Sequence, residues 1–342
     1  MAYASLVKPI SPSPSNIFSK KHFQGKRVFL VFNSVNGSTH ATVPKTLRVA
    51  YQGVPGAYSE FAAKTASPEC TPIPCRAIGD AIKAVEVGQA DLAVVPVEST
   101  MEGTALRNYD LLLQSDLPIV QEINLFVHYC LLAMPGVSKG ELKRVISHPM
   151  ALAHCGRALA QLGLDHEPVE DTAGAVELLR SNHMLDTAAI ASSRAGLIYG
   201  LDVLAHGVQD ESWNVTRFLI LSKNKLNVPN RDRFQFGVKT SMVVAHHTGS
   251  LSVLLKVLSS FSSRKMSLTK LEVKNSGPSV SILDVEKGRG SLKEFPCVLY
   301  VDFEGSIDDM EVKDAISEIS EFPVFVRILG SYSADPNIYG LH

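Results

Sequence analysis

The sequence predicts an α/β protein made of two lobes and a smaller βαββαβ module. From residue 47 onward, short apolar runs alternate with stretches of helical periodicity, which is typical of a largely parallel sheet flanked by helices. An extended run at 119–132 interrupts this alternation once, so we expect the chain to cross there from one lobe to the other. Two lobes imply a cleft between them.

The strands are predicted at 47–51, 92–97, 144–147, 188–191 and 218–221, because these runs are apolar and bounded by turn residues. Helices are predicted at 58–64, 105–114, 149–162 and 193–199, each after a strand, with an additional helix at 173–181. The polar stretch 224–236 contains a proline and predicts a linker. Beyond it the order is strand 237–245, helix 250–261, strand 268–274, strand 297–303, helix 309–319 and strand 324–329, which is the ferredoxin-like βαββαβ order.

Composition limits the classes of function. The chain has 342 residues, enough for two or three domains of ordinary size, and its 33 Lys and Arg balance 34 Asp and Glu. Neither a nucleic-acid partner nor a membrane partner is therefore expected, since there is no basic excess and no apolar run of about 20 residues. The cysteines are scattered without zinc spacing, and we expect reduced thiols at Cys70, Cys75, Cys130, Cys155 and Cys297.

The first 46 residues differ from the rest of the chain. They are rich in Lys, Arg and Ser and contain no acid, since the first acidic residue is Glu60. This composition is typical of an organellar transit peptide. A disordered basic tail on a cytosolic protein is the alternative.

Polar residues follow the predicted strands, where ligands bind in open parallel sheets. They lie in 52–60, 98–104, 147–150, 171–175 and 192–194, and most of these stretches place Ser or Thr at the start of a helix. Helix N-termini favour anions, so a ligand with more than one carboxylate would suit the cleft, although each residue is also an ordinary helix cap. Gly53 and Gly56 lack the spacing of a dinucleotide or phosphate loop, so neither NAD nor ATP is expected. His148 and His154 lie six apart without a matching carboxylate, so we expect no metal site.

Several motifs resemble the prephenate/arogenate dehydratase family. They are "VAYQGVPGAYSEFAA", "VVPVES", "LRNYDLLL", "RVISHP", "DTAGA", "TAAIASSRAGLIYGL" and "NVTRFLIL", while "HHTGSLSVLLKVLSSF", "SLTKLEV" and "FVRILGSY" resemble the family's phenylalanine-binding ACT domain. The basic leader is similar to that of the plastid forms of plants. The resemblance implies a transit peptide at 1–46, a two-lobed, periplasmic-binding-protein-like dehydratase domain at 47–223, a linker at 224–236, an ACT domain at 237–332 and a tail at 333–342.

The resemblance also implies the reaction. Prephenate and arogenate lose water and carbon dioxide, and because the ring becomes aromatic, the family needs no cofactor and no metal. By resemblance, Thr216 is the proton donor or hydrogen-bond catalyst, and Arg217 is a nearby cation that holds a carboxylate or supports the threonine. The implied substrate-binding residues are Ser59, Glu98, Ser99, Thr172, Asn214 and Phe218.

For the module, the resemblance implies phenylalanine as an effector, bound by Gly249, Ser250, Leu251 and Glu272. It further implies a homo-oligomer formed through the ACT domains and a location in the plastid stroma.

The chain departs from the family pattern at three places. Ser99 stands where the family has Asn and Glu102 where it has Gly; Met150 follows "SHP" in place of Gln; and Val273, Lys274 and Asn275 follow Glu272 in place of S-R-P. Since Met cannot replace the hydrogen bonds of an amide, the main alternative is a catalytically impaired paralogue that acts as an amino-acid-sensing or regulatory partner subunit. A binding protein of periplasmic type is a weaker alternative. The preference between arogenate and prephenate stays open.

Overall fold

The structure is a computed structural model that describes residues 46–224, 237–247, 251–275, 278–284 and 291–335. The chain divides into Met1–Pro44 and a compact unit, Lys45–His342, and all the described residues belong to the second. The predicted leader and nearly all of the predicted linker therefore lie outside the described residues. Among the residues that are described, no helix is both long and apolar enough to cross a membrane.

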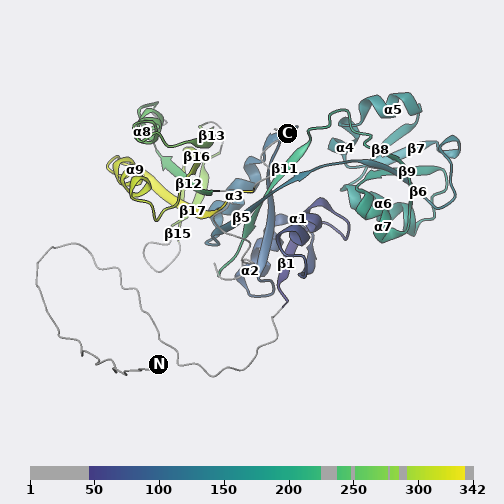
Figure 1. The fold of residues 1–342 in the computed structure, drawn as a ribbon, viewed down its shortest axis with the longest axis horizontal. Helices are drawn as coiled ribbons and strands as arrows, with labels where there is room; N and C mark the ends of the chain where they lie inside the picture. Colours follow the sequence, from purple (N-terminus) through teal and green to yellow (C-terminus); the bar gives the residue numbers. More distant parts are fainter. Residues whose placement is uncertain (1–45, 225–236, 248–250, 276–277, 285–290, 336–342) are drawn as a thin grey trace, which may run out of the picture. The chain divides into compact units, whose positions relative to one another are not determined.

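The larger sheet has ten strands and runs through the first lobe and the module (Figure 1). Its order is β13-β16-β12-β17-β5-β11-β3-β1-β2, with β4 paired to β3. The first-lobe strands are β1 (Arg48–Gln52), β2 (Thr71–Cys75), β3 (Leu92–Ser99), β4 (Gly103–Thr104), β5 (Ile119–Phe126) and β11 (Val215–Leu221). β1 is parallel to β2 and β3, whereas β11 is antiparallel to both β3 and β5.

Helices cover both faces of the first-lobe sheet. α1 (Tyr58–Ala66) lies against β1, β3, β5 and β11, and its alanines pack in one core with Val94 and Phe218. α2 (Ile78–Glu86) and α3 (Leu106–Gln114) pack in a second core with Val95 and Leu219. Because neighbouring strand residues face opposite ways, the two cores lie on opposite faces of the sheet.

The second lobe is a five-stranded sheet of order β10-β6-β9-β7-β8. Its strands are β6 (Cys130–Ala133), β7 (Arg144–Ser147), β8 (Asp165–Pro168), β9 (Thr187–Ala191) and β10 (Asp202–His206), and its helices are α4 (Pro149–Ala153), α5 (Gly156–Leu162), α6 (Thr172–Ser181) and α7 (Ser193–Tyr199). β5 and β6 belong to different sheets, which confirms that the chain crosses between lobes within 119–132.

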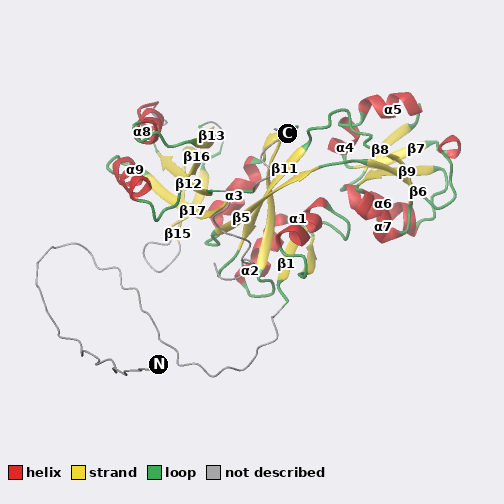
Figure 2. Ribbon diagram, in the orientation of Figure 1, coloured by secondary structure: helices red, strands yellow, loops and turns green. Residues whose placement is uncertain are grey.

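The module has the predicted βαββαβ order. Its elements are β12 (Val238–His246), α8 (Leu251–Ser262), β13 (Leu268–Lys274), β16 (Cys297–Glu304), α9 (Met310–Ser320) and β17 (Phe325–Ser333), with a separate hairpin of β14 (Val280–Asp284) and β15 (Ser291–Phe295) between β13 and β16. Figure 2 shows both helices beside the module's strands. They form one core with Val244 and Phe303, while the other face of the module's sheet joins the core of α3.

The element predictions were wrong in two respects. The predicted helix 149–162 is broken between α4 and α5, because the Asp210 carboxylate accepts a hydrogen bond from the Arg157 amide and the Asp210 amide bonds the His154 carbonyl. In addition, α2 and the strands β2, β4, β8, β10, β14 and β15 were not predicted. β2 contains Pro72 and Pro74, which a sheet tolerates here because β2 is an edge strand.

Candidate active site

Thr216 and Ser99 lie directly opposite each other on adjacent strands. The antiparallel register of β11 and β3 pairs them, and both side chains are partly exposed. They line a cavity of about 130 Å³ together with Glu98, Glu102 and Thr104. Two hydroxyl-bearing residues thus lie side by side on the sheet and line one cavity.

Thr100 fixes the backbone that precedes Thr216. Its hydroxyl donates to the Trp213 carbonyl (2.9 Å) and accepts from the Val215 amide (2.9 Å). The Ser99 hydroxyl accepts from the Met101 amide at 3.2 Å, which closes the adjoining turn. Thr100 was not among the predicted site residues, although a further hydroxyl directly after "VES" is a signal that could have pointed to it.

Ser59 and Thr172 line a second, larger cavity of about 580 Å³. The loops after β1 and β2 form one side of it, and His148 and 170–172 of the second lobe form the other. Thr172 is the first residue of α6, which Asp171 caps through a 2.6 Å bond from the Gly174 amide. In the described part of the chain no side chain caps α1 at Ala57, so the first-turn amides of that helix are available to an anion.

The two lobes contact each other beside this larger cavity. The Ser192 hydroxyl donates to the Gly56 carbonyl (3.0 Å), and Arg194 pairs with Glu60 (3.3 Å). A further contact joins His154 Nε2 to Glu102 Oε1 at 2.6 Å. This corrects the expectation that His154 lacks a matching carboxylate: tertiary folding supplies Glu102, which lies 52 residues away in sequence.

Arg217 lines neither cavity, so the expectation that it holds a carboxylate of the substrate was wrong. Successive side chains of a strand face opposite ways, and Arg217 lies on the face of β11 that Leu219 also occupies. Its side chain is 4% exposed, and it donates to Glu122 (2.9 Å), Asp302 (2.6 Å) and the Tyr332 hydroxyl (2.9 Å). Burial alone would lower the pKa of Arg217, but the negative charge around it raises that pKa well above its ordinary value.

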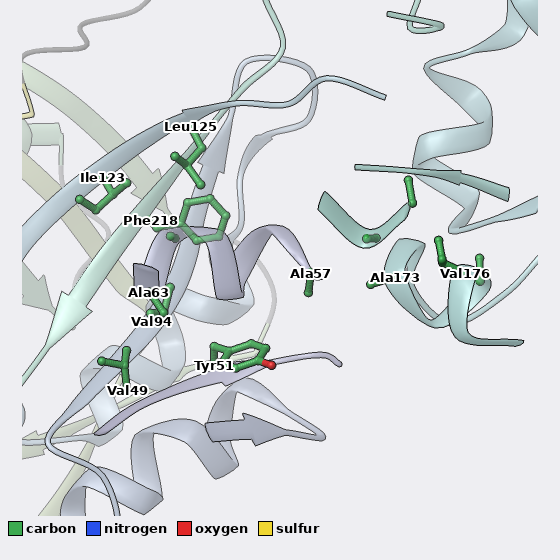
Figure 3. Packing of buried hydrophobic residues seen from close by; sticks show 14 of the residues in the cluster. Val49, Tyr51, Ala57, Ala63, Val94, Ile123, Leu125, Ala173, Val176 and Phe218 are labelled. Atoms are coloured by element: carbon green, nitrogen blue, oxygen red, sulfur yellow. The ribbon is translucent and has the colours of Figure 1, made fainter. Parts of the chain in front are cut away.

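The expectation that Phe218 contacts substrate was also wrong. Phe218 is 2% exposed and packs in the core between the sheet and α1, where Figure 3 shows it beside Leu125. Its place in that core follows from its register, because it lies opposite Ile123 on β5.

The remaining predicted residues have varied positions. Asn214 is buried, and its carbonyl accepts a hydrogen bond from the Val127 amide (2.8 Å), so it supports the segment that crosses between the lobes. Glu98 lines the smaller cavity and also pairs with Lys270 of β13 at 3.3 Å. Leu251 opens α8 and is 66% exposed, Glu272 lies on the edge strand β13, and Gly249 and Ser250 lie outside the described residues.

Among the described residues, no group of three or more His, Cys, Asp or Glu side chains is arranged to hold a metal ion. The side chains that line the two cavities supply hydroxyls, carboxylates, one imidazole and one guanidinium, and the larger cavity also meets the N-termini of α1 and α6. Together with two α/β lobes and a βαββαβ module that shares the larger sheet, they define a two-lobed α/β protein with a polar small-molecule cavity lined by both lobes.

Comparison with known proteins assigns the family. The model of the prephenate dehydratase family matches residues 49–226. An arogenate dehydratase/prephenate dehydratase of Arabidopsis thaliana, named chloroplastic, is 51% identical over 292 residues, which cover 84% of this chain and 69% of that protein. The chain belongs to the prephenate dehydratase family.

Solved structures share the fold. A prephenate dehydratase from Arthrobacter aurescens in complex with L-Phe is 26% identical, with a TM-score of 0.71 over 86% of this chain and 93% of that one. A structure described as a novel type of quorum-quenching acylase is 31% identical, with a TM-score of 0.71 over 84% and 98%. One fold thus carries proteins named for different activities.

Proposed function

We propose that this chain is a decarboxylating dehydratase that converts arogenate to phenylalanine, prephenate to phenylpyruvate, or both. The observation that carries the proposal is the family match at 49–226, which spans both lobes and ends beyond the strand that holds Thr216. The relative named above carries both activities in its name.

For this reaction the protein has to hold the substrate in position and donate a hydrogen bond or proton to the leaving hydroxyl. Loss of the ring hydroxyl requires a proton, and loss of carbon dioxide then leaves an aromatic ring, which makes the reaction favourable. Thr216 is the proposed donor to the departing hydroxyl, with Ser99 as its neighbour across the strands. A positioned acid of this kind contributes typically about 10²- to 10⁴-fold to a rate.

The larger cavity suits the rest of such a substrate. Its volume of about 580 Å³ lies within the range of small-molecule sites. Carboxylates would be attracted to the uncapped N-terminus of α1 at Tyr58 and Ser59, to Arg76 and to the first residue of α6.

The alternative of a non-enzymatic regulatory paralogue rests on Ser99, Glu102 and Met150. Ser99 still presents a hydroxyl beside Thr216, and Glu102 has a structural partner in His154. These contacts, and the name of the Arabidopsis relative, favour the enzyme.

We further propose regulation and location from the relatives. The Arthrobacter structure holds L-Phe, so phenylalanine is the proposed effector of the module, bound near Gly249, Ser250, Leu251 and Glu272. The resemblance of the module to ACT domains is the reason for proposing it as the contact of a homo-oligomer. The Arabidopsis relative is named chloroplastic, and the acid-free, basic leader fits import into the plastid stroma.

Kinetics of the purified chain from residue 46 tests the proposal. Phenylalanine formed from arogenate and phenylpyruvate formed from prephenate are measured separately, with substrate decay without protein as the background. We expect turnover of at least one substrate. No product above background from either one would reject the enzyme in favour of the regulatory alternative.

A further inference from the structure

A network of buried ion pairs joins the strand that carries Thr216 to the module. At its centre, the Arg217 guanidinium uses three nitrogens for partners on three other strands: Glu122 on β5, Asp302 on β16 and Tyr332 on β17. The side chains of Glu122 and Asp302 are 0% and 2% exposed. Asp302 and Tyr332 belong to the module, so two of the three partners lie outside the lobe that holds the site.

The network extends around two of these partners, Glu122 and Tyr332. Glu122 also accepts from Lys239 of β12 at 2.8 Å and from the Asp335 amide at 3.0 Å. The Tyr332 hydroxyl hydrogen-bonds Ser241 of β12 at 2.6 Å. Three strands of the module, β12, β16 and β17, therefore contribute a side chain to this network.

A second arm reaches the strand that carries Ser99. Lys270 of β13, which is 7% exposed, pairs with Glu98 at 3.3 Å and donates to the Thr104 hydroxyl at 2.7 Å. Glu98 and Thr104 both line the small cavity with Thr216, and Glu98 itself lies 3.6 Å from Arg217. The module thus holds β3 and β11 beside the two hydroxyls of the site.

The ladder between β11 and β3 is irregular beside Arg217. Its register shifts between Arg217 and Phe218, where β3 carries one extra residue, Val97, while the pairing of β11 with β5 is regular at this point. A bulge of this kind increases the local twist and re-aims the side chains beside it. Because Thr216 and Arg217 are adjacent on one strand, a twist of that strand moves both side chains.

We propose that Arg217 is a positioning residue, held by Asp302 and Tyr332 of the module, through which the module sets the orientation of the Thr216 hydroxyl. This inference rests on the proposed function, because it concerns the same site. The module could then affect the reaction without contacting substrate, because the Arg217 guanidinium and the Thr216 hydroxyl lie on opposite faces of one strand.

The test compares Asp302→Asn with Glu318→Gln. Asp302→Asn removes the module's own negative charge beside Arg217, leaves Glu122 and Glu98 in place, and keeps the shape of the side chain. Glu318→Gln is the matched control, because Glu318 is an acid of the same module that pairs with Lys256 and Arg264. We expect Asp302→Asn to lower kcat roughly 2- to 30-fold with little change in KM, and Glu318→Gln to leave both unchanged.

Combination with Thr216→Ala separates positioning from a general loss of structure. If Arg217 acts through Thr216, the double variant Thr216→Ala/Asp302→Asn turns over no more slowly than Thr216→Ala alone, because the hydroxyl to be positioned is gone. Multiplying effects, or an unchanged kcat in Asp302→Asn, would overturn the proposal. Tyr332→Phe, which removes one hydrogen bond and no charge, repeats the test if Asp302→Asn does not fold.

Hydrogen exchange of backbone amides tests the role of Arg217 without relying on enzymatic turnover, so its outcome can be distinguished from failure of the proposed function. If the wild-type chain turns over neither substrate, the proposed function fails, and exchange of the backbone amides of 213–217 then decides the inference. Faster exchange in Asp302→Asn than in Glu318→Gln would support coupling between module and strand. Equal exchange in the two variants would contradict it.

Discussion

At the residue scale, the site depends on the two-residue period of a β-strand. Thr216 faces the small cavity opposite Ser99, while Arg217 faces the module and Phe218 returns to the core of α1. Three consecutive residues thus lie in three different surroundings: Thr216 in the candidate site, Arg217 at the contact between the first lobe and the module, and Phe218 in the hydrophobic core.

Thr216→Ala should lower kcat by about 10²- to 10⁴-fold and change KM much less, because the hydroxyl acts on the leaving group more than on substrate binding. Thr216→Ser keeps the hydroxyl and should retain most of the turnover. Steady-state kinetics of both variants on the better substrate measures the difference. A Thr216→Ala protein with wild-type kcat would remove this residue from the chemistry.

At the element scale, Gly56 places the start of α1 against α7 of the second lobe. Its backbone has φ of +93°, which favours glycine, and a Cβ there would lie 2.9 Å from both the Cα and the Cβ of Ala195. The contact with Ala195 is close, so it leaves no room for a side chain at residue 56.

Gly56→Ala should therefore destabilise the protein by about 1–3 kcal/mol and raise KM, since the larger cavity lies beside this contact. Thermal unfolding and KM are measured together, with Gly79→Ala as the control, because a Cβ at Gly79 meets no atom within 4 Å. Equal unfolding temperatures and KM values for the two variants would show that the contact between lobes tolerates a side chain.

At the scale of the whole molecule, the module is part of the first lobe's structure. β17 joins β5 through Ser333 and Gln121, and Gly330 packs against the Ile119 carbonyl so closely that a Cβ would overlap it. Tyr300 and Leu329 of the module share one core with Leu113 and Leu219 of the lobe.

A chain limited to residues 45–224 should consequently fail to reach a stable fold. It would expose the apolar face that Tyr300 and Leu329 cover, and it would leave Arg217 without Asp302; loss of one partner from a buried pair alone costs about 3–5 kcal/mol. Near-ultraviolet circular dichroism and thermal unfolding measure the outcome against the full chain. A cooperative transition at the temperature of the full chain would contradict this prediction.

Much of this architecture could be predicted from local pattern. Residues 144–147, 193–199 and 268–274 were predicted with the bounds of β7, α7 and β13, because apolar periodicity and turn residues act over a few positions. The break between α4 and α5 could not be predicted from local pattern, because it depends on Asp210, which is distant in sequence.

The features of the site also fall into those that local sequence predicts and those that depend on tertiary contacts. The sequence by itself determined the family, the order of the elements and the hydroxyls at strand and helix ends, because these are properties of short motifs. Only the tertiary structure decided that Arg217 serves the joint with the module, that Phe218 is core and that Glu102 meets His154. Each of these depends on which distant strand or loop lies beside a residue, and buried charges are stable only where folding brings such partners within hydrogen-bond distance.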